Sequence, residues 1–83
     1  MWRIDWTKKA KTQFKKINKK DQKRISNALE ECADDPIIRT VQLVNSPLRR
    51  LKVGDYRIVI LTQKNIMTIN IIKVKHRRDA YKI

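Results

Sequence analysis

The sequence predicts an α+β domain in which two N-terminal helices pack on one face of a small, mostly antiparallel β-sheet. Three observations predict this class. Apolar residues alternate with polar ones over residues 2–6, recur at helical spacing over residues 10–32, and then fill short segments separated by turn signals. The expected order is β-α-α-β-β-β, and the 83 residues suffice for one domain, residues 1–83, with one modest core.

The chain begins with a predicted strand and a short amphipathic helix. In the strand, residues 2–6, every second residue is apolar, which is typical of a half-buried strand. Its shared face holds Trp2, Ile4 and Trp6. The helix follows Thr7, a residue type that caps helix N-termini, and lysines surround its apolar stripe. That stripe consists of Ala10, Phe14 and Ile17.

A second helix is predicted to begin at Lys19 or Lys20, after Asn18 interrupts the first. It ends before Pro36, because proline disfavours a helical conformation in the residue before it. The link between the helices is short, so we expect an antiparallel helical hairpin. The apolar stripe of this helix consists of Ile25, Ala28, Leu29 and Cys32.

The second half of the chain is predicted to form strands. Residues 40–44 are a short candidate, and residues 48–53 and 56–62 form a hairpin around Gly54 and Asp55. Residues 66–74 are rich in isoleucine, which predicts a buried, central strand.

The hairpin turn predicts which side chains lie opposite each other. If Gly54 and Asp55 are the whole loop, Lys52 lies directly opposite Arg57 on the neighbouring strand. One face of the hairpin is then apolar and meets the helices, whereas the other carries Arg50, Lys52 and Arg57. Like charges in opposed positions destabilise a sheet by up to about 1 kcal/mol.

Two interpretations of these cations stay open at this point. Basic residues on an exposed sheet face are often simply solvated. A phosphate among them would instead make the cluster favourable, because the planar guanidinium matches phosphate oxygens two at a time. Four more basic residues follow the last predicted strand, namely Lys75, His76, Arg77 and Arg78.

Composition limits the partners and the chemistry. The 21 Lys and Arg outnumber the 8 Asp and Glu, and the net charge of +13 predicts a polyanionic partner. The acids are scattered and there is one histidine, so neither a metal site nor another cofactor is expected. The single cysteine, Cys32, excludes an internal disulfide and is expected in the core. No signal peptide or membrane span is visible, which predicts a cytoplasmic protein without a membrane partner.

Three stretches of the sequence resemble the RelE/ParE toxin superfamily of toxin–antitoxin systems. They are LKVGDYRIVI in the hairpin, the isoleucine-rich segment after it, and HRRDAY near the C-terminus. The resemblance covers nearly the whole chain. It implies a toxin that is neutralised by a cognate acidic antitoxin.

The two branches of this superfamily differ in activity. RelE-like members are ribosome-dependent mRNA endonucleases that use no metal, in which the 2′-hydroxyl attacks the adjacent phosphate of A-site mRNA. ParE-like members inhibit DNA gyrase without being enzymes and tend to lack the terminal catalytic tyrosine and arginine. Here Tyr81 and either Arg77 or Arg78 are present, which favours the RelE branch. A gyrase inhibitor and an inactive nucleic-acid-binding homologue are the alternatives.

The resemblance also implies roles for individual residues. Arg57 matches the arginine that contacts the scissile phosphate, and Lys52 matches the candidate general base. Arg77 is the expected catalytic arginine, with Arg78 as the alternative, and Tyr81 matches the tyrosine that orients the substrate nucleotide.

The remaining basic side chains are expected to bind RNA. They are Arg50, Lys75, His76 and Arg78. Arg50 stands where lysine is frequent and cannot lose a proton, so its role would be electrostatic. His76 could also serve as the general acid, because an ordinary histidine titrates near pH ~6.5.

Overall fold

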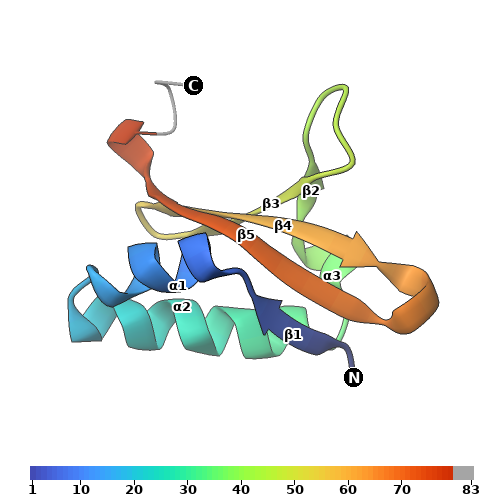
Figure 1. Ribbon diagram of the computed structural model, residues 1–83, viewed down its shortest axis with the longest axis horizontal. Coiled ribbons are helices and arrows are strands. Elements are labelled where there is room, and N and C mark those ends of the chain that lie inside the picture. The colour runs from blue at the N-terminus through green and yellow to red at the C-terminus, as the bar shows by residue number, and fades with distance from the viewer. Residues whose placement is uncertain (80–83) are drawn as a thin grey trace.

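The computed structural model describes residues 1–79, and the main elements follow the predicted order (Figure 1). The helices are α1 (Lys8–Lys15), α2 (Lys19–Cys32) and the four-residue α3 (Pro36–Arg39). The strands are β1 (Arg3–Trp6), β2 (Val41–Gln42), β3 (Arg49–Val53), β4 (Tyr56–Gln63) and β5 (Thr68–His76). Two 3-10 turns, η1 (Lys64–Ile66) and η2 (Arg77–Asp79), flank β5. No helix in these residues is long and apolar enough to cross a membrane.

The strands form one sheet in the order β1-β5-β4-β3-β2. β1 pairs parallel with β5, and all other pairs are antiparallel, which confirms the predicted α+β class. Helices α1 and α2 lie on one side of this sheet (Figure 1). The other side, which we call the open face, is not covered by either of these two helices.

Side chains cap both helices, and the cap at Thr7 confirms the prediction from the sequence. The Thr7 hydroxyl accepts a hydrogen bond from the Ala10 backbone N–H at 3.2 Å and donates one to the Ile71 carbonyl at 2.7 Å. The same residue therefore starts α1 and ties it to β5. Asn18 caps α2 by accepting from the Asp21 N–H at 2.9 Å.

Two glutamine side chains hold α1 in place, one at its link to α2 and one at its contact with β5. The Gln22 amide donates to the carbonyls of Phe14 and Ile17 at 3.0 and 2.9 Å, which satisfies carbonyl groups at the end of α1. The Gln13 side chain accepts from the Val74 backbone N–H at 2.8 Å. This bond places α1 against the stretch of β5 that β1 does not reach.

The core lies between α2 and the sheet. Isoleucines of β4 and β5 meet the predicted stripe of α2, in which Cys32 is fully buried and its pKa is raised by burial. Trp6 packs at the margin, with its ring 4.8 Å from that of Phe14. The fully buried side chains include Ile25, Cys32, Ile58, Ile60, Ile69 and Ile71.

Three local features differ from the expectation. Residues 36–39 form α3, which begins at Pro36 because proline is compatible with the first helical turn. The strand predicted at residues 40–44 is only Val41–Gln42. The last strand begins at Thr68, because Met67 adopts a left-handed φ of 46° after the 3-10 turn.

A bulge in β5 determines which of its side chains reach the open face. Val59 pairs with Lys73, whereas the next residue, Ile60, pairs with Ile71, so Ile72 has no partner in the register. Ile71 and Val74 both face the core although they are three residues apart. Lys73 and Lys75 consequently point to the open face.

Candidate anion-binding site on the open face

Three cations from three neighbouring strands form a line across the open face. Lys52 of β3 pairs with Arg57 of β4, as the hairpin turn predicted, and Arg57 pairs with Lys75 of β5. Paired residues project from the same face of a sheet. We call Lys52, Arg57 and Lys75 the basic row.

No acidic side chain among residues 1–79 forms an ion pair with the basic row. The Arg57 guanidinium donates through Nη1 to the carbonyls of Gly54 and Tyr56, both at 3.0 Å. These bonds hold the side chain at the hairpin turn and use one nitrogen, so the other N–H groups can reach a ligand.

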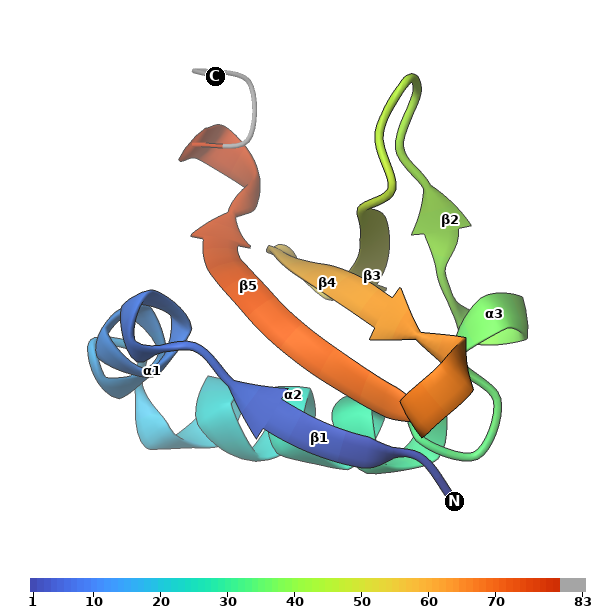
Figure 2. The same cartoon turned by 45° about the vertical axis from the view of Figure 1, so that its right-hand side comes forward.

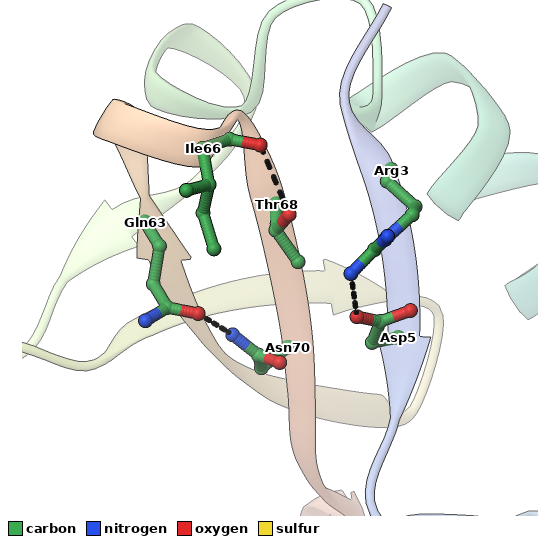
Figure 3. Close-up of polar contacts among 6 residues, drawn as sticks. All are labelled: Arg3, Asp5, Gln63, Ile66, Thr68 and Asn70. Atoms are coloured by element: carbon green, nitrogen blue, oxygen red, sulfur yellow. Dashed lines mark hydrogen bonds and ion pairs between the residues drawn. The ribbon is translucent and has the colours of Figure 1, made fainter.

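The opposite end of the open face is different, because its polar side chains are matched (Figure 3). Arg3 contacts Asp5 at 2.9 Å, and the Asn70 amide donates to Gln63 at 2.6 Å. Thr68 donates to the Ile66 carbonyl at 3.1 Å. These contacts pair polar side chains at that end, whereas the basic row has no ion-pair partner among residues 1–79.

Burial and neighbouring charges lower the pKa of Lys75 on balance, although the nearby Asp79 carboxylate acts to raise it. Burial lowers the pKa of the Lys75 ammonium most, and the positive charges of Lys73 and Lys9 lower it further. An anion bound at the basic row would oppose this effect. Lys52, at the other end of the row, is exposed.

The backbone of Arg77 lies next to the hairpin turn at the end of the basic row. Arg77 and Arg78 are exposed in η2, and the Arg77 backbone N–H donates to the Asp55 carbonyl of the hairpin turn. Figures 1 and 2 show that η2 rises on the side of the sheet away from α1 and α2. The loop between β2 and β3 rises on the same side.

The structure does not bring His76 to the open face. His76 pairs with Tyr56, whose side chain lies on the helix-covered face, and the two rings meet edge to face at 5.2 Å. Its Nδ1 accepts from the Arg78 backbone N–H at 3.3 Å. His76 and Arg78 are among the residues that line a hollow of about 640 Å³ between α1 and the end of β5, and Lys75 of the basic row lines it as well.

The Arg49 guanidinium is held by hydrogen bonds to α3 and to the residue that follows it. Its Nε donates to the Thr40 hydroxyl at 2.7 Å, and its Nη2 donates to the carbonyls of Ile37 and Thr40, both at 3.1 Å. Arg49 therefore joins β3 to the end of α3.

Arg50 and Lys73 lie beside the basic row on the open face. Arg50 is exposed on the open face, where it pairs with Val59. Tyr81 lies outside the described residues. Sequence reasoning did not single out Lys73, which pairs with Val59 from the other side. The two-residue spacing of Lys73 and Lys75 indicates that they share one face of the strand. Only the bulge in β5 shows that this is the open face.

The fold can be compared with solved structures. It matches a chain of the intact E. coli RelBE toxin–antitoxin complex with a TM-score of 0.81 and 17% identity, over 92% of this chain and 96% of that one. It matches a chain of the archaeal RelE–RelB complex from Pyrococcus horikoshii OT3 with a TM-score of 0.80 and 22% identity, over 92% and 94%. The isolated E. coli RelE toxin matches with a TM-score of 0.82 and 17% identity, over 99% and 93%. The chain thus has the fold of small RelE-type toxins.

Sequence comparison identifies the family. A family model described as the ParE toxin of the type II toxin–antitoxin system parDE matches residues 4–81. The chain belongs to this toxin family, within the RelE/ParE superfamily that the sequence resembles. No match is found among curated proteins.

Proposed function

We propose that the protein, acting as one toxin domain over residues 1–83, is a ribosome-dependent endoribonuclease that cleaves A-site mRNA without a metal ion. The observation that carries this proposal is the basic row, in which three cations on rigid strands lack acidic partners among residues 1–79. Such a row fits the charge that develops on a phosphate during transfer. Solvation alone does not require the cations to be opposed on adjacent strands.

The proposed reaction is an internal phosphate transfer. Lys52 acts as the general base and takes the proton of the 2′-hydroxyl, whose oxygen attacks the adjacent phosphorus. The bond from phosphorus to the 5′-oxygen breaks, leaving a 2′,3′-cyclic phosphate, and the 5′-oxygen takes up a proton from water to become a 5′-hydroxyl. Arg57 and Lys75 hold the non-bridging oxygens, and Arg77 adds positive charge beside the hairpin turn. Tyr81 orients the nucleotide in this proposal.

His76 has a smaller role in this mechanism than the resemblance implies. Its ring lies beside Tyr56 and its Nδ1 is occupied by the Arg78 backbone N–H. It would have to turn around the sheet edge to protonate a leaving group at the basic row. We therefore propose that His76 supports η2, while Arg50 and Arg78 add to RNA binding.

The partner proposed for the free toxin is an acidic antitoxin. Two of the structurally similar chains come from complexes of RelE with RelB. The net charge of +13 favours association with an acidic protein. We expect a helix or strand of that protein to bind the toxin.

A second candidate function is inhibition of DNA gyrase, because the matching family model is named for ParE. The two candidates are separated by adding purified toxin to ribosomes programmed with a defined mRNA, and in parallel to a gyrase supercoiling assay. Cleavage within the A-site codon supports the endonuclease. Inhibited supercoiling together with intact mRNA would refute it and support the gyrase inhibitor.

A further inference from the structure

A second line of side chains crosses the open face beside the basic row. Arg50 of β3, Val59 of β4 and Lys73 of β5 are paired in register, two residues along each strand from the basic row. We call these three residues the second row. Two residues along a strand separate the rows by roughly 6.7 Å. That separation is comparable to the spacing of successive phosphates in a nucleic-acid strand.

The centre of the second row is apolar, unlike that of the basic row. Val59 stands between the two cations and is half-buried, so the stems of Arg50 and Lys73 flank an apolar floor. The two strands that carry them are about 9.6 Å apart, at two strand spacings. Both side chains are long enough to converge on one anion above Val59.

Neither cation has an acidic partner among residues 1–79. The ion pairs of this part of the chain involve Arg3, Arg24 and Arg39 only. Lys73 is half-buried and acts electrostatically on Lys75, which places its charge close to the basic row. The bulge at Ile72 is what turns Lys73 to this face.

We propose that Arg50 and Lys73 bind the phosphate that neighbours the scissile one. The second row thereby sets which phosphodiester bond is presented to the basic row. This inference rests on the proposed endoribonuclease function. It assigns Lys73 as a positioning residue, which holds the substrate backbone without touching the reacting atoms.

The test is single-turnover cleavage of ribosome-bound mRNA by the wild type and by Lys73→Met, which keeps the length of the side chain but removes its charge. Each protein is assayed on native mRNA and on mRNAs with one neutral methylphosphonate immediately 5′ or 3′ of the scissile phosphate. We expect Lys73→Met to raise the half-saturating toxin concentration about tenfold, the scale for losing one charged hydrogen bond, and to leave the saturated rate largely unchanged. Lys73→Arg should restore binding.

The decisive result is whether the effect of the Lys73→Met substitution and the effect of the methylphosphonate depend on each other. If Lys73 binds a neighbouring phosphate, one of the two methylphosphonates costs the wild type about tenfold but costs Lys73→Met almost nothing. Lys64→Met, an exposed lysine of η1 at the other end of the sheet, should show the full methylphosphonate effect. If each methylphosphonate instead costs Lys73→Met as much as it costs the wild type, Lys73 does not bind either neighbouring phosphate. That result would overturn the inference while leaving the proposed function intact.

Two further outcomes are informative. A wild type that leaves ribosome-bound mRNA uncleaved would overturn the proposed function, and the inference with it. A fall in the saturated rate of Lys73→Met equal to that of Arg57→Ala would place Lys73 in the reaction itself and refute a positioning role. Thermal melting of each variant shows that the comparison is made between folded proteins.

Discussion

Lys52 and Arg57 lie directly opposite each other on β3 and β4, and Lys75 lies on the far side of Arg57. Repulsion in such a line opposes folding, by up to about 1 kcal/mol for a directly opposed pair. The arrangement therefore does not favour folding by itself, and we propose that a bound phosphate accounts for it.

Arg57→Ala should reduce mRNA cleavage by about 100-fold or more, the scale for losing one preorganised transition-state contact. The free energy of unfolding should change by less than about 1 kcal/mol, because relief of repulsion offsets the two lost carbonyl contacts. Single-turnover cleavage and thermal melting measure the two effects. A variant that melts far below the wild type would show that Arg57 is mainly structural.

Arg49→Ala should have the opposite profile. It removes the charged donors that bind Thr40 and the Ile37 carbonyl, so we expect a loss of about 1.5–3 kcal/mol in the free energy of unfolding. Cleavage per folded molecule should stay close to wild type. Urea denaturation beside the cleavage assay tests this, and Arg49→Lys should rescue only part of the stability, because lysine lacks the forked donors.

Gly54→Ala should destabilise the hairpin that sets the basic row. Gly54 has a φ of +55°, and an added Cβ would lie 2.8 Å from Nη2 of Arg24 on α2. We expect a loss of about 1–2 kcal/mol from the left-handed backbone alone. Gly54→Asn should cost less, since asparagine tolerates this conformation. Repeating Gly54→Ala in an Arg24→Ala background should relieve the steric part but not the backbone part.

Lys75 should make stability depend on alkaline pH. Its pKa in the folded protein lies below that of the unfolded chain, 10.5, so between these values the unfolded state binds the extra proton. The stability of the wild type therefore rises with pH through this window. Burial and Asp21 raise the pKa of Tyr56. Above pH 10 this residue therefore has the opposite effect, and the stability of the folded protein falls as pH rises. The wild type and Lys75→Met share the effect of Tyr56, so it cancels when the two are compared. Lys75→Met should therefore melt above the wild type at neutral pH, and the difference in melting temperature should shrink as pH rises.

Cleavage should not depend on a divalent ion held by the protein. Among residues 1–79, no three histidine, cysteine or acidic side chains cluster as metal ligands would. A phosphorothioate at the scissile phosphate should slow cleavage, and Mn²⁺ or Cd²⁺ should not restore the rate. Restoration by a thiophilic ion would instead indicate direct metal contact.

The sequence by itself determined the features that depend on neighbouring residues. Gly54 and Asp55 close a two-residue turn, so the pairing of Lys52 with Arg57 follows from counting along the chain. Thr7 and Asn18 cap α1 and α2 because their side chains bond to backbone N–H groups within one turn. The apolar periods then predicted helices α1 and α2 and the buried face of the hairpin correctly.

Only the tertiary structure decided how the C-terminal cations are distributed. A shift of one residue in strand register turns every side chain to the other face, and the bulge at Ile72 makes such a shift within β5. It places Lys73 and Lys75 on the open face and leaves His76 beside Tyr56. Likewise, the bonds from Arg49 to α3 join segments whose approach depends on the packing of the whole sheet. These contacts lie outside what local period and turn chemistry determine, because they depend on how distant strands pair.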